Sequence, residues 1–501
     1  MTIQSEHWPL HPLIYEINTI TWLNELSNSF DYEINLQNVP EGILDMDLSH
    51  FDAIWLMGVW ERSPEGKDIA RNHPNLQKEF QQALDDFKPT DVAGSPYAVY
   101  YYHVATELGG KTGVQMFKDE LAKRGARLIL DYVPNHVARD HLWTLEKNSN
   151  VFIKGTQKDL EENPDDFFSI GNKIYAHGRD PYFPPWTDTI QINAFSKEAR
   201  KKAINTLLSI AELCDGVRCD MAMLMINKVF KKTWGEKVGE PPEKEFWEEV
   251  IPAVKKEHPD FKFFGEAYWG TEWELQQQGF DFCYDKILYE RLLHDNAPSV
   301  KGHLRAEWEY QRSLVRFIEN HDEERAISAF GYEKSKAAAI ISCTLPGARM
   351  IHYGQMLGRK IRTPIQLARA PKEEDDQDLM EFYLRLINSI PDRNLRENSW
   401  HMCETQSINS DNDSNKSLIS YIWAQGSEYK LIIVNYSSYP AQGHILLPDL
   451  DPSKEWTFSD SLKQDVYTYK GGKIRENGLY VELGAWEGHI FKINEKLKES
   501  R

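Results

Sequence analysis

Cysteine is scarce in this chain of 501 residues: there are five, an odd number, and none stands in C-x-x-C spacing. This pattern favours neither a disulfide framework nor a zinc site, and it indicates a reducing compartment. The sequence also lacks any run of about 18 apolar residues, and residues 1–9 contain neither the basic segment nor the apolar core of a signal peptide. We therefore expect a soluble, cytoplasmic protein.

Basic residues are too few to balance the acidic ones. The 58 lysines and arginines stand against 77 aspartates and glutamates, which leaves a formal net charge of −19. This excess argues against binding to nucleic acid or to an anionic membrane, so we expect neither partner and predict a neutral small-molecule substrate. Aromatic residues are abundant at 12%, with 15 tryptophans, and aromatic faces are common platforms for sugar rings. The composition does not indicate an oligomeric state.

Eight short apolar runs alternate with helical patterns along most of the chain. Strands that are buried on both faces of a parallel sheet have this continuous apolar pattern, and one ordinary core of about 150 residues is too small for the whole chain. The arrangement predicts an α/β fold, a (β/α)8 TIM barrel with functional groups at the carboxyl ends of its strands. The predicted strands are 13–18, 53–59, 128–131, 216–220, 261–266, 281–284, 315–320 and 349–352.

Two further regions complete the predicted organisation. Residues 138–193 are too many for a βα loop and are rich in Asn, Asp, Gly and Pro, so we expect a small subdomain inserted after the third strand. Short alternating runs after the last barrel helix predict a C-terminal antiparallel β-sandwich. The predicted domains are a catalytic barrel over 1–395, the insert over 138–193 and the sandwich over 396–501.

Acidic residues stand at the ends of four predicted strands: Asp131, Asp220, Glu266 and Asp322. Alternation along a strand places Arg218 on the same face as Asp220, where the guanidinium can keep that carboxylate ionised. A single Arg-x-Asp at a strand end is typical of a local ion pair. Four acidic strand ends in one barrel instead predict a shared active site.

Four short motifs contain these residues, in chain order: 131–136 (DYVPNH), 216–220 (GVRCD), 264–266 (FGE) and 319–322 (ENHD). Together they resemble the α-amylase family of glycoside hydrolases. In that family the fold is a (β/α)8 barrel with an insert after the third strand and a C-terminal β-sandwich, which agrees with the predicted layout over most of the chain. Each motif alone is modest, whereas the four in order at barrel spacing are specific.

The resemblance implies a role for each of three carboxylates. Asp220 corresponds to the nucleophile, Glu266 to the general acid/base and Asp322 to the carboxylate that stabilises the oxocarbenium-like transition state. Retaining glycosidases need the nucleophile and the acid about 5 to 5.5 Å apart, and neighbouring strand ends can supply that separation. We expect Arg218 to keep Asp220 charged. Desolvation beside Tyr268 and nearby negative charge should raise the pKa of Glu266.

The same resemblance assigns further residues to the substrate site. His136 and His321 correspond to histidines that hydrogen-bond the sugar in the cleaved subsite. Tyr97 corresponds to a tyrosine that stacks under the same sugar, and the three consecutive tyrosines that follow soon after compete for that position. Asp131 is expected to pair with Arg218 and so to organise the nucleophile.

Many family members bind a structural Ca²⁺ between barrel and insert through an Asn, an Asp and a His. The corresponding residues here are Asn135, Gln191 and Leu224, which offer too little negative charge to a hard cation. We predict no Ca²⁺ at this site, no other metal and no organic cofactor. Met223 stands where a lysine usually lines the leaving-group side, so the leaving-group contacts should differ from those of starch-degrading endo-amylases.

The insert contains an aromatic stretch, 177–186, with two alternative roles. It could form a rigid aromatic wall over the active site, with Arg179 or Asp180 gripping sugar hydroxyls. Its aromatic residues could instead be the insert's own small core. Trp269 and Gln355 lie where families of this kind tune specificity.

We predict a retaining α-glycoside hydrolase that cleaves α-glucosidic bonds in oligosaccharides or disaccharides through a covalent glycosyl-Asp220 intermediate. Two alternatives stay open: a transglycosylase or phosphorylase that uses the same residues, and a catalytically inactive barrel that binds carbohydrate. The intact carboxylates argue against the second. The sequence leaves open the linkage, the substrate chain length, and exo or endo action.

Overall fold

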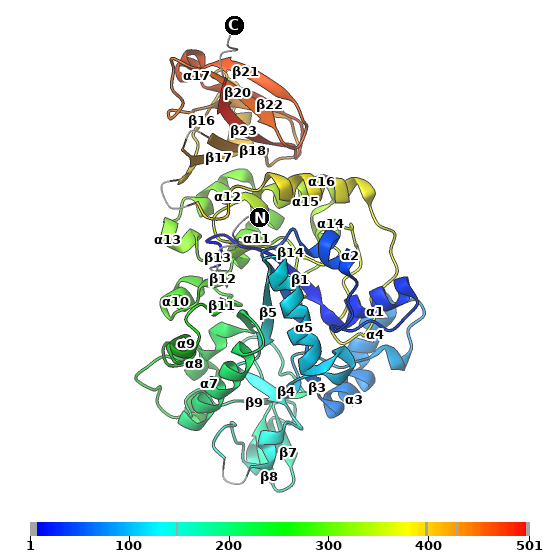
Figure 1. The fold of residues 1–501 in the computed structure, drawn as a ribbon. Coiled ribbons are helices and arrows are strands. Elements are labelled where there is room, and N and C mark those ends of the chain that lie inside the picture. Colours follow the sequence, from blue (N-terminus) through cyan, green and yellow to red (C-terminus); the bar gives the residue numbers. More distant parts are fainter. Residues whose placement is uncertain (1–7, 147–148, 396–398, 427, 497–501) are drawn as a thin grey trace. The chain divides into compact units, whose positions relative to one another are not determined.

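The eight predicted barrel strands are present in the computed structural model (Figure 1), which describes residues 8–146, 149–395, 399–426 and 428–496. They hydrogen-bond in the order β1-β14-β13-β12-β11-β10-β5-β2 and close into a barrel, which confirms the predicted fold class. Arg396, the predicted start of the C-terminal domain, lies outside the described residues. The strands are β1 (Leu13–Asn18), β2 (Ala53–Met57), β5 (Arg127–Tyr132), β10 (Gly216–Cys219), β11 (Lys262–Gly265), β12 (Phe282–Tyr284), β13 (Leu314–Arg316) and β14 (Ala348–His352).

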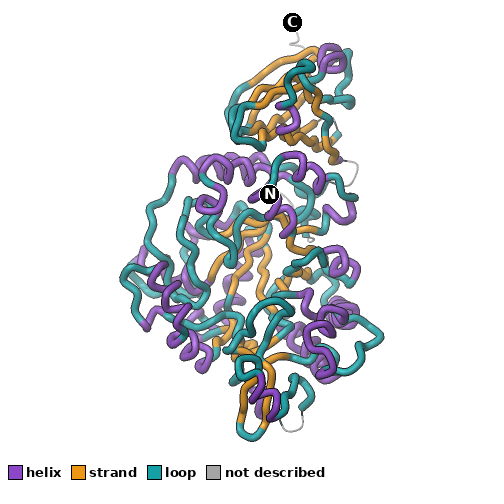
Figure 2. Tube along the Cα trace, turned by 180° about the vertical axis from the view of Figure 1, so that it is seen from behind, coloured by secondary structure: helices purple, strands orange, loops and turns teal. Residues whose placement is uncertain are grey.

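Helices connect the strands and lie outside them (Figure 2). In α5 the residues Val114, Phe117 and Leu121 form one buried stripe, and Gly125 then adopts a left-handed φ of +79° that turns the chain into β5. The helices are α1 (Thr19–Phe30), α2 (Glu41–Ile43), α3 (Pro64–Asn72), α4 (Pro74–Ala83), α5 (Gly110–Lys123), α7 (Lys197–Ala211), α8 (Asn227–Trp234), α9 (Phe246–Glu257), α10 (Glu272–Gln277), α11 (Lys286–His294), α12 (Ala297–Leu304), α13 (Trp308–Gln311), α14 (Ala326–Phe330), α15 (Tyr332–Thr344) and α16 (Gln377–Ser389).

A small lobe follows the third barrel strand. Strands β6 (His136–Ala138) and β9 (Thr189–Gln191) pair in antiparallel fashion, and between them lie α6 (Gln157–Glu162) and the hairpin of β7 (Phe167–Ile170) and β8 (Lys173–Ala176). A second hairpin, β3 (Trp60–Arg62) with β4 (Val99–Val104), follows β2. The lobe has its own buried cluster, formed by Val137, Val151, Phe152, Phe168, Tyr175, Ile190, Ile192 and Ala199.

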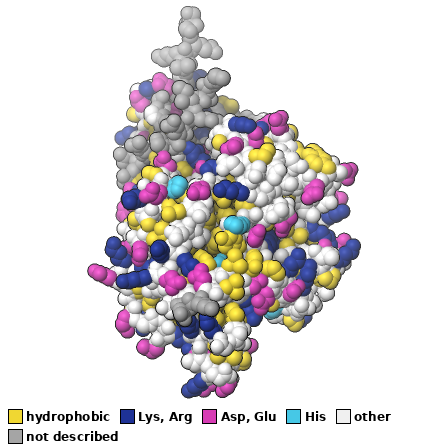
Figure 3. All heavy atoms as spheres, turned by 60° about the horizontal axis from the view of Figure 1, so that its bottom comes forward, with side chains coloured by type: hydrophobic (Ala, Val, Ile, Leu, Met, Phe, Trp, Pro, Cys, Tyr) yellow, Lys and Arg dark blue, Asp and Glu magenta, His cyan; other side chains and the backbone are white. Residues whose placement is uncertain are grey.

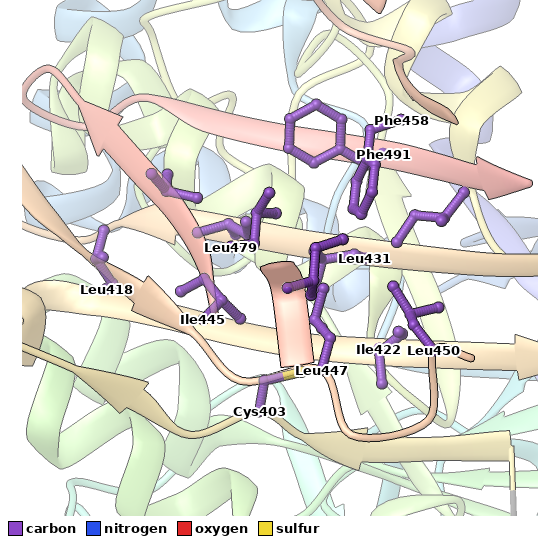
Figure 4. Close-up of a cluster of buried hydrophobic side chains, with 14 of the residues drawn as sticks. Cys403, Leu418, Ile422, Leu431, Ile445, Leu447, Leu450, Phe458, Leu479 and Phe491 are labelled. Carbon is purple, nitrogen blue, oxygen red and sulfur yellow. The ribbon is translucent and has the colours of Figure 1, made fainter. Parts of the chain in front are cut away.

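The C-terminal strands form two antiparallel sheets with a hydrophobic core (Figure 4). The six-stranded sheet has the order β15-β17-β18-β23-β20-β21, and the three-stranded sheet has the order β16-β19-β22. Leu431, Ile445, Phe458 and Leu479 are among the buried side chains of that core. The elements are β15 (Trp400–Met402), β16 (Thr405–Gln406), β17 (Leu418–Gln425), β18 (Glu428–Asn435), β19 (Ala441–Ile445), β20 (Glu455–Asp460), β21 (Val466–Lys470), α17 (Gly471–Asn477), β22 (Leu479–Leu483) and β23 (Gly488–Glu495).

The chain divides into two compact units that do not follow the predicted boundary at residue 395. Unit 1 comprises Met1–Trp8, Ile14–Tyr284 and Ile361–Lys372, and unit 2 comprises Pro9–Leu13, Asp285–Lys360 and Glu373–Arg501. The physical reason lies within unit 2, where the C-terminal sheet is tied to the preceding helices. The Trp423 indole donates to the Thr344 carbonyl at 2.8 Å, and the Thr344 and Tyr421 hydroxyls lie 2.6 Å apart.

No helix in the described part of the chain is long and apolar enough to cross a membrane. Acidic and basic side chains are interspersed over the face of the molecule shown in Figure 3, around a band of hydrophobic ones. The acidic side chains on that face therefore do not form one continuous acidic patch, although the net charge of the chain is −19.

Candidate active site

Strand β10 brings two of the predicted acidic groups together with their arginine. It pairs in parallel with β5, where Arg218 lies opposite Asp131, and on its other side with β11. The pairing continues one residue beyond the strands, since the Glu266 N–H donates to the Cys219 carbonyl at 3.0 Å. Asp220 and Glu266 are therefore neighbours at the carboxyl ends of adjacent strands.

The Arg218 guanidinium contacts three carboxylates. Its Nη1 lies 2.8 Å from Oδ1 of Asp220, and its Nη2 lies 2.7 Å from Oε2 of Glu266. The predicted pair with Asp131 is present but longer, at 3.8 Å. Because one rigid fork contacts both Asp220 and Glu266, the two carboxyl groups lie close together.

Three aromatic rings surround this guanidinium. Its central carbon lies 5.2 Å from the ring centre of Tyr97, 5.3 Å from that of Trp55 and 5.8 Å from that of Tyr284. Burial alone would lower the pKa of Arg218, but the Glu266 carboxylate and the other charges nearby raise it well above its usual value. Tyr97 thus lies beside the arginine that contacts the acidic groups. Trp55 and Tyr284 were not predicted, because an aromatic residue in an apolar run is indistinguishable from core.

Asp131 anchors the loop that follows β2. Its Oδ1 accepts from the Trp55 indole at 3.2 Å, and its Oδ2 accepts from the Gly58 N–H at 2.9 Å. Gly58 has a φ of +79°, in the left-handed region that favours glycine. Trp60 donates its indole N–H to the Asp131 carbonyl at 2.8 Å. These contacts tie Asp131 to the loop after β2, beside Arg218.

The Glu266 carboxylate is surrounded by hydrogen-bond donors. The Met221 N–H donates to Oε2 at 2.6 Å, and the Tyr268 hydroxyl donates to Oε1 at 2.9 Å. Tyr268 was predicted to act as a desolvating neighbour, and this interpretation is incomplete because its polar end faces the carboxylate. Neither donor is visible in the sequence, since one is a backbone group and the other depends on a rotamer.

His136 lies beside Tyr97 and Trp186. Burial lowers the pKa of His136 to about 3, although a hydrogen bond with the Tyr97 backbone opposes the shift. The His136 and Trp186 ring centres lie 4.9 Å apart. The imidazole is therefore neutral near pH 7 and can hydrogen-bond a sugar hydroxyl without adding charge.

Asp322 and His321 belong to unit 2 and follow β13. The Asn320 side-chain oxygen accepts the N–H groups of Asp322 and Glu323, both at 2.9 Å, so an Asx turn sets the direction of Asp322. The His321 Nε2 lies 3.0 Å from Oδ2 of Asp322, whose side chain is 43% exposed. Asp322 is thus an accessible carboxylate with a histidine neighbour.

Glu319 supports this segment from the buried side. Burial would raise the pKa of Glu319, but Arg325, His352 and the Ala326 N–H lower it below the usual value. The Arg325 Nη1 lies 2.5 Å from Oε1, and the His352 Nδ1 lies 2.9 Å from the same oxygen. The glutamate is therefore a charged anchor for the loop after β13.

The three positions that correspond to the family's calcium site do not fit a cation. The fully buried Gln191 donates its Nε2–H groups to the Asn135 carbonyl and Oδ1, both at 2.9 Å, and to the Ile192 carbonyl at 3.0 Å. These are the oxygens that a hard cation would need. Leu224 is buried and apolar. Within the described ranges, no group of three or more His, Cys, Asp and Glu side chains could hold a metal ion.

Two aromatic residues of the insert stretch do not belong to a small core. Tyr182 and Phe183 are 57% and 65% exposed, so that alternative is wrong for both. Asp180 is buried, and its Oδ1 accepts the N–H groups of Tyr182 and Phe183 at 2.6 and 2.9 Å, while Arg179 pairs with Asp166 at 2.7 Å. Arg179 and Asp180 therefore hold the loop. The alternative in which they grip sugar hydroxyls stays a prediction.

Three other positions singled out in the sequence are divided between surface and interior. Trp269 is 43% exposed, and its ring meets the Tyr182 ring edge-on with centres 4.9 Å apart. Gln355 is buried and donates to the Tyr383 hydroxyl at 2.9 Å, so it is a packing residue rather than a surface determinant of specificity. Met223 is fully buried in the turn after Asp220.

Comparisons with known proteins agree with the geometry. The family model "Alpha amylase, catalytic domain" matches residues 50–405. An alpha-amylase of Haloarcula japonica is 23% identical over 444 residues, which is 86% of this chain but only 56% of that protein's length. An intracellular maltogenic amylase of Bacillus subtilis is 21% identical over 501 residues, covering 94% of this chain and 77% of that protein. The crystal structure of an alpha-amylase from Geobacillus thermoleovorans, complexed with acarbose, has a TM-score of 0.65 at 18% identity, covering 98% of this chain and 100% of that one.

Proposed function

Because the chain belongs to the alpha-amylase family of glycoside hydrolases, we propose that it is a retaining α-glycoside hydrolase that cleaves α-glucosidic bonds in oligosaccharides or disaccharides. The observation that carries this proposal is the single guanidinium of Arg218 in contact with both Asp220 and Glu266. Two neighbouring carboxyl groups are what a double displacement uses. Relatives named maltogenic amylase and neopullulanase support an α-glucan substrate.

In the first step, an oxygen of Asp220 attacks the anomeric carbon while Glu266 gives its proton to the glycosidic oxygen. The bond to the leaving sugar breaks, and a glycosyl ester of Asp220 forms. In the second step, Glu266 takes a proton from water, whose oxygen attacks the same carbon and releases Asp220. Asp322 is proposed to stabilise the positive charge that develops on the sugar ring in both steps.

The remaining predicted residues are proposed to hold the sugar and the charges. Arg218 keeps Asp220 ionised and fixes its direction, which a nucleophile needs. Tyr97 offers a ring face to the sugar, and His136 and His321 offer hydrogen bonds to its hydroxyls. We also propose that the protein acts inside the cell, in line with its scattered cysteines and with relatives named intracellular maltogenic amylases.

The proposal predicts hydrolysis with retention. Purified protein is incubated with maltose, isomaltose, trehalose, sucrose, maltotriose and soluble starch, and the released sugar is followed by proton NMR. The first product should be the α-anomer, because two inversions restore the starting configuration. Release of the β-anomer would contradict the mechanism. Sugar release that requires an added acceptor or inorganic phosphate would instead identify a transglycosylase or a phosphorylase.

We further propose that Gln191 replaces calcium in tying the insert to the barrel. Dialysis against a chelator should leave the Tm unchanged, whereas Gln191→Ala should lower the free energy of unfolding by about 3 kcal/mol, since it leaves buried carbonyl oxygens without donors. The matched control is Gln157→Ala at an exposed position of α6, which should cost about 0.5 kcal/mol or less. Urea unfolding followed by circular dichroism measures both variants. A chelator-dependent Tm would refute the proposal.

A further inference from the structure

The two oxygens of the Glu266 carboxylate have different surroundings. Oε2 receives the Met221 N–H at 2.6 Å and lies 2.7 Å from the Arg218 Nη2. Oε1 receives the Tyr268 hydroxyl at 2.9 Å. The first oxygen thus faces two groups that can only donate hydrogen, whereas the second faces a hydroxyl that can either donate or accept.

A proton on Oε2 would point at groups that cannot accept it. A peptide N–H and a guanidinium offer no lone pair, so a proton on Oε2 would lose the hydrogen bond from the Met221 N–H, at a cost of about 1 to 3 kcal/mol, and would remove the charge that pairs with Arg218. A proton on Oε1 keeps the contact with Tyr268 if the Tyr268 hydroxyl rotates from donor to acceptor. The acidic proton of Glu266 therefore belongs on Oε1.

The donor on the Oε2 side is held in place by the backbone. Met221 has a φ of +42°, in the left-handed region that non-glycine residues rarely adopt. Its carbonyl accepts the Leu224 N–H at 3.0 Å, and the next N–H, that of Ala222, donates to the Glu266 carbonyl at 3.1 Å. Trp247 also donates its indole N–H to the Ala222 carbonyl at 2.9 Å. This turn keeps the Met221 N–H aimed at Oε2.

We propose that Tyr268 is a positioning residue that directs the catalytic proton of Glu266 to Oε1, an inference that rests on the proposed function. When Glu266 is ionised, the Tyr268 hydroxyl donates to Oε1. When Oε1 carries the proton, the hydroxyl turns and its oxygen lies beside that proton as acceptor. In the first step the Oε1 proton moves to the glycosidic oxygen as the bond to the leaving sugar breaks. The hydroxyl then turns back to the new carboxylate. Tyr268 keeps its own proton throughout.

The variant Tyr268→Phe tests this inference cleanly, because the local backbone does not depend on the hydroxyl. The Tyr268 carbonyl is held by Thr271, whose hydroxyl and N–H donate to it at 2.7 and 3.3 Å. The chain also offers a matched control: the Tyr480 hydroxyl lies 3.0 Å from Oε2 of Glu482, a glutamate two residues away, on β22. Tyr480→Phe removes the same kind of bond in the C-terminal sheet.

The experiment measures kcat on two substrates, one whose leaving group needs a proton and one whose leaving group departs without it. With the disaccharide cleaved fastest by the wild type, Tyr268→Phe should lower kcat about tenfold, because that leaving group needs the proton. With p-nitrophenyl α-glucoside, which leaves without one, kcat should change less than about twofold. The alkaline limb of the disaccharide pH profile should also move to higher pH, since the ionised carboxylate loses a donor. Tyr480→Phe should match the wild type on both substrates.

Three outcomes would overturn the inference: unchanged kinetics in Tyr268→Phe, an equal loss on both substrates, or an unmoved alkaline limb. The variant Glu266→Gln distinguishes a failure of this inference from a failure of the proposed function. That variant should lose the disaccharide reaction and keep most of the p-nitrophenyl reaction's first step. If Glu266→Gln instead cleaves the disaccharide like the wild type, Glu266 is not the acid, and the proposed function fails first.

Discussion

Asp220→Asn is expected to lower kcat about 10⁴-fold, which corresponds to about 5.5 kcal/mol of barrier. The carboxamide has nearly the same shape, but its oxygen is a poor nucleophile and cannot stabilise the developing positive charge. The contact with Arg218 at 2.8 Å also loses its ionic character. Turnover of the best disaccharide, with folding checked by circular dichroism, measures the effect.

The control for this variant lies at the other end of the same strand, just before its first residue. Asp215→Asn changes an aspartate that precedes β10, pairs with Lys118 at 3.0 Å and accepts the Leu128 N–H at 2.9 Å. It should keep kcat within about twofold, because its partners lie at the amino end of the strand, away from the reacting groups. Hydrolysis at the wild-type rate by Asp220→Asn would refute the assignment of the nucleophile. A mass increase on the Asp220 peptide after treatment with a fluoroglucoside would support it directly.

Arg218→Met is expected to remove both stability and activity. The methionine matches the arginine stem in length, but it leaves Asp220 and Glu266 without the cation that neutralises them. Breaking a buried pair in this way costs about 3 to 5 kcal/mol of unfolding free energy. The loss should be larger at pH 8 than at pH 5, because an uncompensated carboxyl group is easier to bury when it is protonated. Urea unfolding at the two pH values measures the loss of stability and its pH dependence, and turnover of the best disaccharide measures the loss of activity.

A double variant tests whether the missing charge is the cause. In an Asp220→Asn background, Arg218→Met should lower the free energy of unfolding markedly less than in the wild type. The reason is that the asparagine in place of Asp220 carries no charge that needs a cation. Equal costs in the two backgrounds would show that the arginine acts through packing against Tyr97, Trp55 and Tyr284 instead. An exposed ion pair serves as the control. Arg71→Met breaks a contact with Asp68 at 3.6 Å and should lower the free energy of unfolding by only about 0 to 1 kcal/mol.

Most of the barrel was readable from the sequence because strands buried on both faces leave an unbroken apolar run. The runs at 53–59 and 216–220 both became barrel strands, β2 and β10, within two residues of the predicted ends. Alternation along β10 was enough to place Arg218 beside Asp220. Such inferences use only neighbours in the chain, and local periodicity carries that information.

The division into units and the role of the insert's aromatic stretch were not readable in this way. Tyr182 and Phe183 have the composition of a core, yet the buried Asp180 turns their backbone so that both rings are exposed. The composition of unit 2 reflects contacts such as that between Trp423 and Thr344, which are far apart in the sequence. Periodicity does not encode which surface a helix or sheet packs against.

By itself, the sequence determined the barrel, the order of the four motifs and the chemical identity of the acidic groups, because these depend on local pattern and residue type. Only the tertiary structure decided that Arg218 contacts Glu266 as well as Asp220, and that Met221 and Tyr268 occupy different oxygens of that glutamate. Those contacts follow from the register between β10 and β11 and from one left-handed backbone turn. These contacts cannot be inferred from the sequence around β10 or around β11 alone, because they form only when the two strands pair in one register.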